Sequence, residues 1–142
     1  MATQSKAQAH WEGSLMEGAG SVDLVTSGVG HFDLKWAKRA EASAGATNPE
    51  ELIAAAHASC YSMALSHALA GNGTPAESID TTAVVGFQPG VGITGSDLTV
   101  KAKVPGLTEN EFQKFADEAK TGCPVSAALT GIPITLTAEF IS

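Results

Sequence analysis

Residues 48–65 read Asn-Pro-Glu-Glu-Leu-Ile-Ala-Ala-Ala-His-Ala-Ser-Cys-Tyr-Ser-Met-Ala-Leu, and this stretch decides the fold because it is the strongest helix signal in the chain. Asn48, or Thr47 before it, can cap a helix whose first turn tolerates the proline. The glutamates at 50–51 place negative charge at the positive end of the helix dipole. The apolar composition continues to Ala70, before a Gly-Asn-Gly stop. We predict a helix of about five or six turns, buried at the centre of the fold because most of its faces are apolar.

Strand patterns stand on both sides of this helix. Three short runs separated by glycines predict an antiparallel meander before it, at 7–11, 21–26 and 31–36. Alternating runs around a Pro-Gly turn predict a hairpin after it, at 78–87 and 93–104, and a last strand is expected at 133–140.

A second helix is expected between the hairpin and the last strand. Thr108 and Glu111 have the spacing of a capping box, which predicts an amphipathic helix reaching about Lys120. A short helical piece should follow from Pro124, because proline suits a first helical turn. The order βββ-α-ββ-α-β indicates an α+β fold with antiparallel sheets and a buried central helix.

Composition sets the class of protein. The chain has 142 residues, of which 44% are hydrophobic and 16% charged, so we expect one globular domain spanning 1–142. A net charge of −7, with eight Lys and Arg, argues against nucleic acid and anionic membranes as partners. No apolar run approaches the roughly 20 residues that span a bilayer, and we expect a cytoplasmic protein.

The two cysteines are the candidate reactive groups. In a reducing compartment they are expected to be free, metal-binding or catalytic rather than a structural disulfide. The four histidines show no zinc-ligand spacing, so we expect no metal. Cys60 lies in mid-helix, where a buried thiol is ordinarily inert unless a cation such as Arg39 stabilises its thiolate. Cys123 precedes Pro124 at a predicted helix start, where free N–H groups favour negative charge. On these facts alone, packing and chemistry both stay open.

Two cysteine motifs in a fixed order resemble those of a known family. The stretch 48–65, followed some sixty residues later by Gly-Cys-Pro-Val-Ser at 122–126, is similar to the osmotically inducible protein C (OsmC) family of organic hydroperoxide reductases. The resemblance also covers 8–13, 78–83 and the last strand. His57 before Cys60 resembles the OsmC branch rather than its organic hydroperoxide resistance (Ohr) sister branch.

The resemblance implies a thiol peroxidase without metal, flavin, haem or other cofactor. Cys60 would attack the peroxide and become a sulfenic acid, and Cys123 would resolve it as an intramolecular disulfide. A dithiol reductant, in this family a dihydrolipoyl group, would reduce that disulfide by exchange. Arg39 falls where the family places an arginine that holds the thiolate, with Lys38 as the neighbouring alternative. Glu50 falls where the family places the carboxylate partner of that arginine.

The spacing of Glu50 and Cys60 adds a prediction of its own. Ten residues separate them, which is roughly 15 Å along a straight helix, so the two side chains cannot meet through that helix. If two copies of the helix crossed antiparallel near the alanines at 54–56, Glu50 of one copy would approach Cys60 of the other. We therefore predict an intertwined homodimer with composite sites.

Two other functions remain alternatives. His57 stands three residues before Cys60 and could act as the base of a Cys–His hydrolase or acyltransferase. No orienting Asn or Asp and no oxyanion signature accompany it. The other alternative is a stress-induced ligand-binding protein in which the cysteines have no catalytic role.

Overall fold

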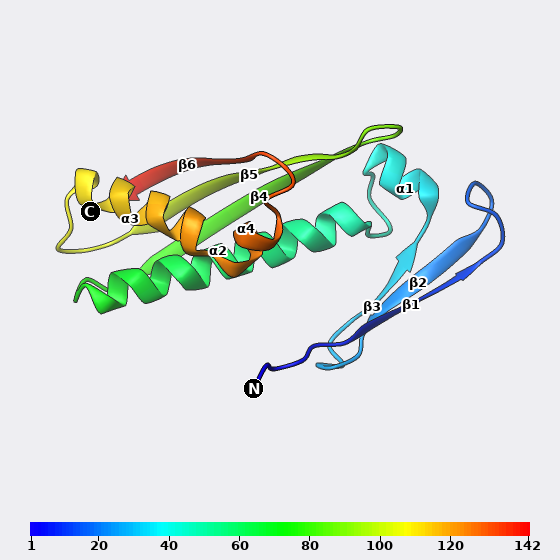
Figure 1. The fold of residues 1–142 in the computed structure, drawn as a ribbon, viewed down its shortest axis with the longest axis horizontal. Coiled ribbons are helices and arrows are strands. Elements are labelled where there is room, and N and C mark those ends of the chain that lie inside the picture. The colour runs from blue at the N-terminus through cyan, green and yellow to red at the C-terminus, as the bar shows by residue number, and fades with distance from the viewer. The chain divides into compact units, whose positions relative to one another are not determined.

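The computed structural model describes all residues, 1–142. Its helices and strands follow one another along the chain (Figure 1) as β1 (Ala7–Glu12), β2 (Ala19–Leu24), β3 (His31–Leu34), α1 (Trp36–Glu41), α2 (Pro49–Gly71), β4 (Ser78–Gln88), β5 (Gly92–Lys103), α3 (Glu109–Gly122), α4 (Pro124–Ala128) and β6 (Ile134–Ile141). The chain forms two compact units, residues 1–52 and 53–142. Helix α2 begins in the first unit and continues through the second.

The first unit holds the predicted meander. Strands β1, β2 and β3 pair antiparallel in that order. The third strand is shorter than predicted because it ends at Leu34, and Trp36 begins helix α1. Helix α1 is not predictable from the sequence, because a helix of six residues without a side-chain cap shows neither apolar periodicity nor a start signal.

The second unit contains the predicted hairpin and last strand, but its sheet is mixed. Strands β4 and β5 pair antiparallel, whereas β6 lies parallel to β5, with Ser96 opposite Ile134. The expectation of antiparallel sheets therefore needs correction at β6. A parallel pair requires a crossover connection of a dozen or more residues, and α3 and α4 supply it between β5 and β6.

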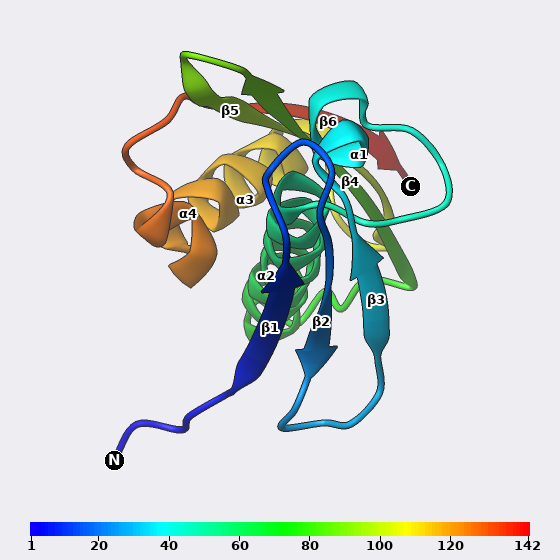
Figure 2. The same ribbon diagram turned by 90° about the vertical axis from the view of Figure 1, so that its right-hand side faces the viewer.

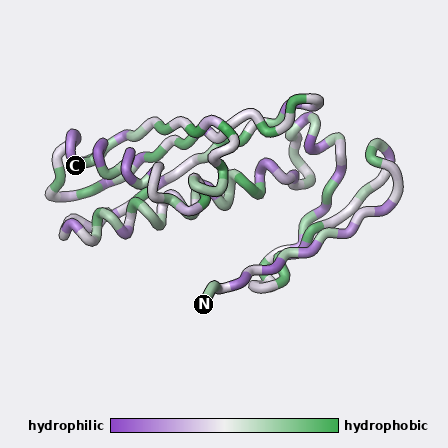
Figure 3. The backbone as a smooth tube through the Cα atoms, viewed as in Figure 1, coloured by the Kyte–Doolittle hydropathy of each residue, from purple (hydrophilic) through white to green (hydrophobic).

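One face of the β4–β5–β6 sheet carries the helices of the second unit (Figure 2). Burial alternates along β5, where Leu98, Val100 and Ala102 point into the core and the residues between them are exposed. The core also contains residues from α2 and α3, including Tyr61, Leu65, Leu69, Phe112 and Ala116. Hydrophobic and hydrophilic positions accordingly alternate along these strands in Figure 3.

The predicted starts of the two long helices are confirmed. The N–H of Glu51 donates to the side-chain oxygen of Asn48 over 2.8 Å at the start of α2. At α3, Thr108 and Glu111 form the complete capping box.

Helix α2 buries a single stripe in the second unit. His57, Tyr61, Leu65 and Leu69 follow one another at intervals of four residues and are fully buried. Met63, on another face, is 71% exposed. In the single chain α2 is therefore buried along one stripe rather than on most of its faces.

Candidate active site

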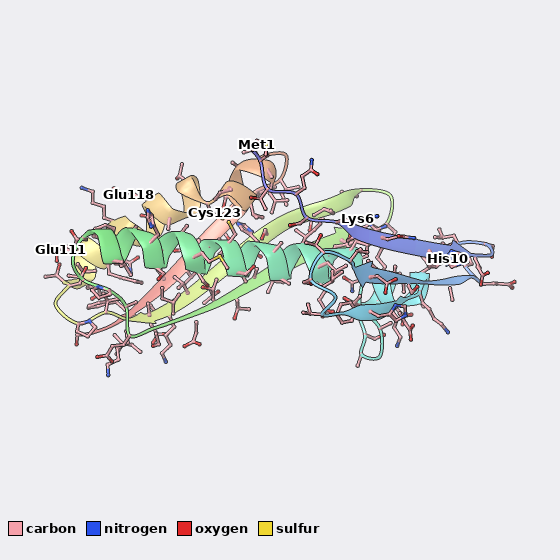
Figure 4. The ribbon with its side chains drawn as sticks, turned by 90° about the horizontal axis from the view of Figure 1, so that it is seen from below. Met1, Lys6, His10, Glu111, Glu118 and Cys123 are labelled. Carbon is pink, nitrogen blue, oxygen red and sulfur yellow. The ribbon has the colours of Figure 1, made fainter.

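The two cysteines meet in the second unit. Cys60 is carried by α2, and Cys123 stands between α3 and α4, beside α2 in Figure 4. Both thiols are free, Cys60 packs against the core cluster that contains Cys123, and hydrogen bonding between the two thiols shifts the pKa of each. Cys60 is partly exposed, whereas Cys123 is fully buried. A reactant from solvent can therefore reach the sulfur of Cys60 more readily than that of Cys123.

The surroundings of the two thiols shift their pKa values in opposite directions. Burial raises the pKa of the Cys60 thiol, and the hydrogen bond with Cys123 raises it further, against one backbone N–H from Val125. Burial also acts to raise the pKa of Cys123, but the polar groups around its sulfur act more strongly to lower it: the backbone N–H of Ser126, the Cys60 thiol, the Ser126 hydroxyl and the N–H of Val125. The pKa of Cys123 is therefore lowered, and within the second unit the anion of the pair belongs on Cys123.

His57 forms a buried polar cluster next to this pair. Its Nδ1 lies 2.6 Å from Oγ of Ser96 on β5, and its Nε2 lies 2.8 Å from Oγ of Ser126 on α4. Burial lowers the pKa of His57, so the ring is neutral at ordinary pH. Both ring nitrogens are engaged by serine hydroxyls, so neither is left to accept a proton directly from Cys60. This geometry does not support the Cys–His hydrolase alternative.

Arg39 and Glu50 meet in the first unit. The guanidinium of Arg39 donates from Nη2 to Oε1 of Glu50 over 2.9 Å, and from Nε to both carboxylate oxygens at 3.1 and 3.3 Å. Glu50 is 4% exposed. The neighbouring Lys38 instead donates to Oγ of Ser43 and to the carbonyl oxygen of Ala44. The cation that pairs with Glu50 is thus Arg39, in a multidentate arrangement that a lysine could not form.

An apolar hollow of about 290 Å³ lies beside Arg39 in the first unit. Its lining includes Trp11, Leu34, Trp36 and Arg39. A cation at the edge of an apolar wall suits a molecule with one polar end and one hydrocarbon end.

The structure thus brings the four predicted site residues together in two pairs, Cys60 with Cys123 and Arg39 with Glu50. Two residues of the buried His57 cluster, Ser96 and Ser126, were not predicted from the sequence. Ser126 lies inside the second cysteine motif and could have been singled out there. Nothing in the sequence around Ser96 separates it from other serines on strands.

Two general features of the chain also bear on the type of site. No group of three or more His, Cys, Asp and Glu side chains is placed to hold a metal ion. None of the helices combines the length and the hydropathy that a bilayer crossing requires.

Comparisons with known proteins identify the family to which this fold belongs. The model of the OsmC-like protein family matches residues 41–137. Peroxiredoxin OsmC of Escherichia coli (strain K12) is 42% identical over 132 residues, which cover 91% of this chain and 92% of that protein. An organic hydroperoxide resistance protein of Xanthomonas axonopodis pv. citri (strain 306) is 38% identical over 95 residues, 64% of this chain and 66% of that protein.

A solved structure has the same architecture. The organic hydroperoxide resistance protein OsmC of Legionella pneumophila superposes with a TM-score of 0.73 at 27% identity, covering 98% of both chains. Fold and site thus define an α+β protein with a paired-thiol centre. The chain belongs to the OsmC family, a family of cysteine-based hydroperoxide reductases.

Proposed function

We propose that this protein reduces organic hydroperoxides to alcohols with Cys60 as the attacking thiolate and Cys123 as the resolving thiol. The observation that carries the proposal is a partly exposed thiol packed beside a buried one, so that each thiol shifts the pKa of the other. The names of the relatives, peroxiredoxin and organic hydroperoxide resistance protein, support the substrate class. The apolar hollow beside Arg39 supports an alkyl or lipid substituent on the peroxide.

The reaction has two steps at sulfur. The Cys60 thiolate attacks the outer oxygen of the peroxide, the O–O bond breaks, and the alkoxide leaves and takes a proton to become the alcohol. Cys60 is then a sulfenic acid. The Cys123 sulfur attacks the sulfur of Cys60, an S–S bond forms, and the departing hydroxide takes a proton to give water. A dithiol of the dihydrolipoyl type would return both cysteines to thiols by exchange, in the cytoplasm.

Cys60 needs a cation for the first step. Within the second unit, hydrogen bonding favours the anion on Cys123 and leaves the proton on Cys60. A guanidinium next to Cys60 would reverse this preference, because a positive charge stabilises a thiolate and orients peroxide oxygens. We assign this role to Arg39, with Glu50 holding its guanidinium.

The disulfide is the direct test of this function. We expect wild-type protein mixed with cumene hydroperoxide to form one Cys60–Cys123 disulfide per chain within the first turnover, seen by peptide mass spectrometry after rapid acid quenching. Hydrogen peroxide at the same concentration serves as the comparison and should react more slowly, because it cannot use an apolar pocket. Two thiols that stay reduced in the presence of excess peroxide would instead favour a non-catalytic ligand-binding protein.

We further propose that the active site is shared between two chains of a homodimer. Glu50 and Cys60 are separated by ten residues of one continuous helix, about 15 Å. The exposed residues of α2 near its middle, Ala55, Ala56 and Ser59, are small, so a second copy of the helix could approach closely there. In this arrangement Arg39 and Glu50 of one chain would serve Cys60 of the other.

Mixing two inactive variants tests the shared site. Cys60→Ser and Glu50→Gln chains should each be nearly inactive, and chains exchanged by partial denaturation and refolding should regain activity. Random pairing makes half of the dimers mixed, with one intact site of two, so we expect roughly a quarter of wild-type activity. A mixture of Cys60→Ser and Cys60→Ala chains is the control and should regain none. No recovery in the first mixture, with mixed dimers verified by native mass spectrometry, would place Glu50 and Cys60 of one chain in one site.

A further inference from the structure

The His57 cluster is a buried ionisable group for which the reaction above has no use. His57 is 0% exposed, as is Ser96, and Ser126 is 4% exposed. No buried side-chain nitrogen or oxygen in the protein lacks a hydrogen-bond partner. A neutral imidazole can donate through one nitrogen and accept through the other, so its contacts with two hydroxyls must have a direction.

The contact between Ser126 and Cys123 sets that direction. Ser126 stands in the first turn of α4, three residues after the N-cap Cys123, which places its hydroxyl next to the Cys123 side chain. The hydroxyl has one proton, and we assign it to the Cys123 sulfur, the direction that lowers the pKa of Cys123. Ser126 can then only accept from His57, so Nε2 of His57 carries the proton. Nδ1 must accept, and the Ser96 hydroxyl donates to it. The hydrogen bonds therefore run in one direction, from Ser96 through His57 and Ser126 to Cys123.

We propose that His57 is a positioning residue for Cys123: through this directed chain of hydrogen bonds it keeps the Ser126 hydroxyl turned toward the sulfur and so stabilises the thiolate that resolves the Cys60 sulfenic acid. The proposal rests on the function proposed above for the resolving step. In that step the Cys123 thiolate supplies the electron pair of the new S–S bond, and hydroxide leaves Cys60. Hydroxide and the proton that Cys123 had given up make water, so His57 stays neutral throughout.

The other titratable groups around the cluster are few. Cys60 and Tyr61 on α2 both interact electrostatically with Cys123, and Asp117 on α3 interacts with Tyr61. The Tyr61 hydroxyl donates to the carbonyl oxygen of Ala116, and burial, with lesser effects of Asp117 and Cys123, raises its pKa so that it stays neutral. Cys60 is thus the one other group that shares a proton with Cys123, and it is removed in the test.

The test measures the titration of Cys123 in a Cys60→Ala background, by the ultraviolet absorbance of the thiolate. We expect Ser126→Ala and His57→Leu each to move this titration to higher pH, leaving about tenfold less thiolate at a given pH below the pKa, since one charge-assisted hydrogen bond is lost or misdirected. His57→Gln keeps a side-chain N–H near the position of Nε2 and should recover most of the thiolate. Ser96→Ala, at the far end of the chain, should have a smaller effect.

A purely structural His57 would behave differently. It would lower the thermal stability of His57→Leu and His57→Gln alike and leave the Cys123 titration unchanged in the folded protein, and that result would overturn the proposal. If His57→Leu does not fold, Ser126→Ala still provides the test. It removes only one hydroxyl group, from the short helix α4. Because this measurement uses no peroxide, its outcome is separate from that of the proposed function.

In protein that keeps both cysteines, the same variants should distinguish the oxidation of Cys60 from the formation of the disulfide with Cys123. With cumene hydroperoxide, His57→Leu and Ser126→Ala should form the Cys60 sulfenic acid, trapped by dimedone, at least as fast as wild type, because a less stabilised Cys123 anion leaves the shared negative charge to Cys60. Disulfide formation should slow by about tenfold, in proportion to the thiolate lost. Equal rates of disulfide formation in Ser126→Ala and wild type would contradict a role in resolution.

Discussion

The Cys60→Ser variant should lose rapid peroxide reduction, whereas Cys123→Ser should complete one turnover and then stop. The physical reason is that peroxide from solvent can reach Cys60, which is partly exposed, before it can reach Cys123, which is fully buried. Removing the attacking nucleophile should cost roughly 10³-fold or more in peroxide consumption under excess dithiol. Stopped-flow mixing with cumene hydroperoxide, with mass spectrometry of quenched samples, measures both outcomes.

The Cys123→Ser variant makes the assignment specific. Its Cys60 should accumulate as sulfenic acid in the first turnover and pass to sulfinic acid when more peroxide is added, because no second thiol protects it. Wild-type protein under the same conditions is the control and should stop at the disulfide. If Cys60→Ser retained the fast reaction and Cys123→Ser lost it, Cys123 would be the attacking thiol. The lowered pKa of Cys123 makes it the more readily ionised thiol within the second unit, so this outcome is a specific alternative that the experiment distinguishes.

The Arg39→Gln variant should react with peroxide about 100-fold more slowly than wild type. Without a guanidinium, the proton shared by the two thiols would stay on Cys60, because the hydrogen bonds of the second unit favour the anion on Cys123. Arg39→Lys should recover little, since an ammonium cannot form the multidentate contact seen with Glu50. The rate of Cys60 oxidation in a single turnover is the measurement.

Lys38→Gln is the matched control for this prediction. Lys38 is adjacent in sequence but binds Ser43 and Ala44, so its loss should change the rate by less than about threefold. Arg39→Gln leaves the buried Glu50 carboxylate without its partner, which costs stability. The double variant Arg39→Gln, Glu50→Gln removes that charge, and it should regain thermal stability yet remain slow. A slow Lys38→Gln beside a fast Arg39→Gln would assign the cation to Lys38.

Much of the fold could be predicted from local patterns. The α2 start follows from the cap at Asn48, and the α3 start from the capping box of Thr108 and Glu111, since both depend on residues within one helical turn. The hairpin followed from alternation on both sides of a Pro-Gly turn. Helix α1 and the parallel pairing of β6 could not be predicted, because a short uncapped helix and a choice of neighbouring strand leave no local pattern.

The candidate site divides in the same way. The sequence by itself determined the two cysteine motifs, the acidic residue at the start of α2 and hence the family, because reactive residue types and their spacing are written along the chain. Only the tertiary structure decided that Cys60 packs beside Cys123, that Arg39 rather than Lys38 binds Glu50, and that His57 lies between two serines. Most of these contacts join residues that are far apart in the chain. In the case of Glu50, two neighbouring cations, Lys38 and Arg39, could each have been its partner. Packing brings them together, and the direction of each hydrogen bond then follows from which group has a proton to donate.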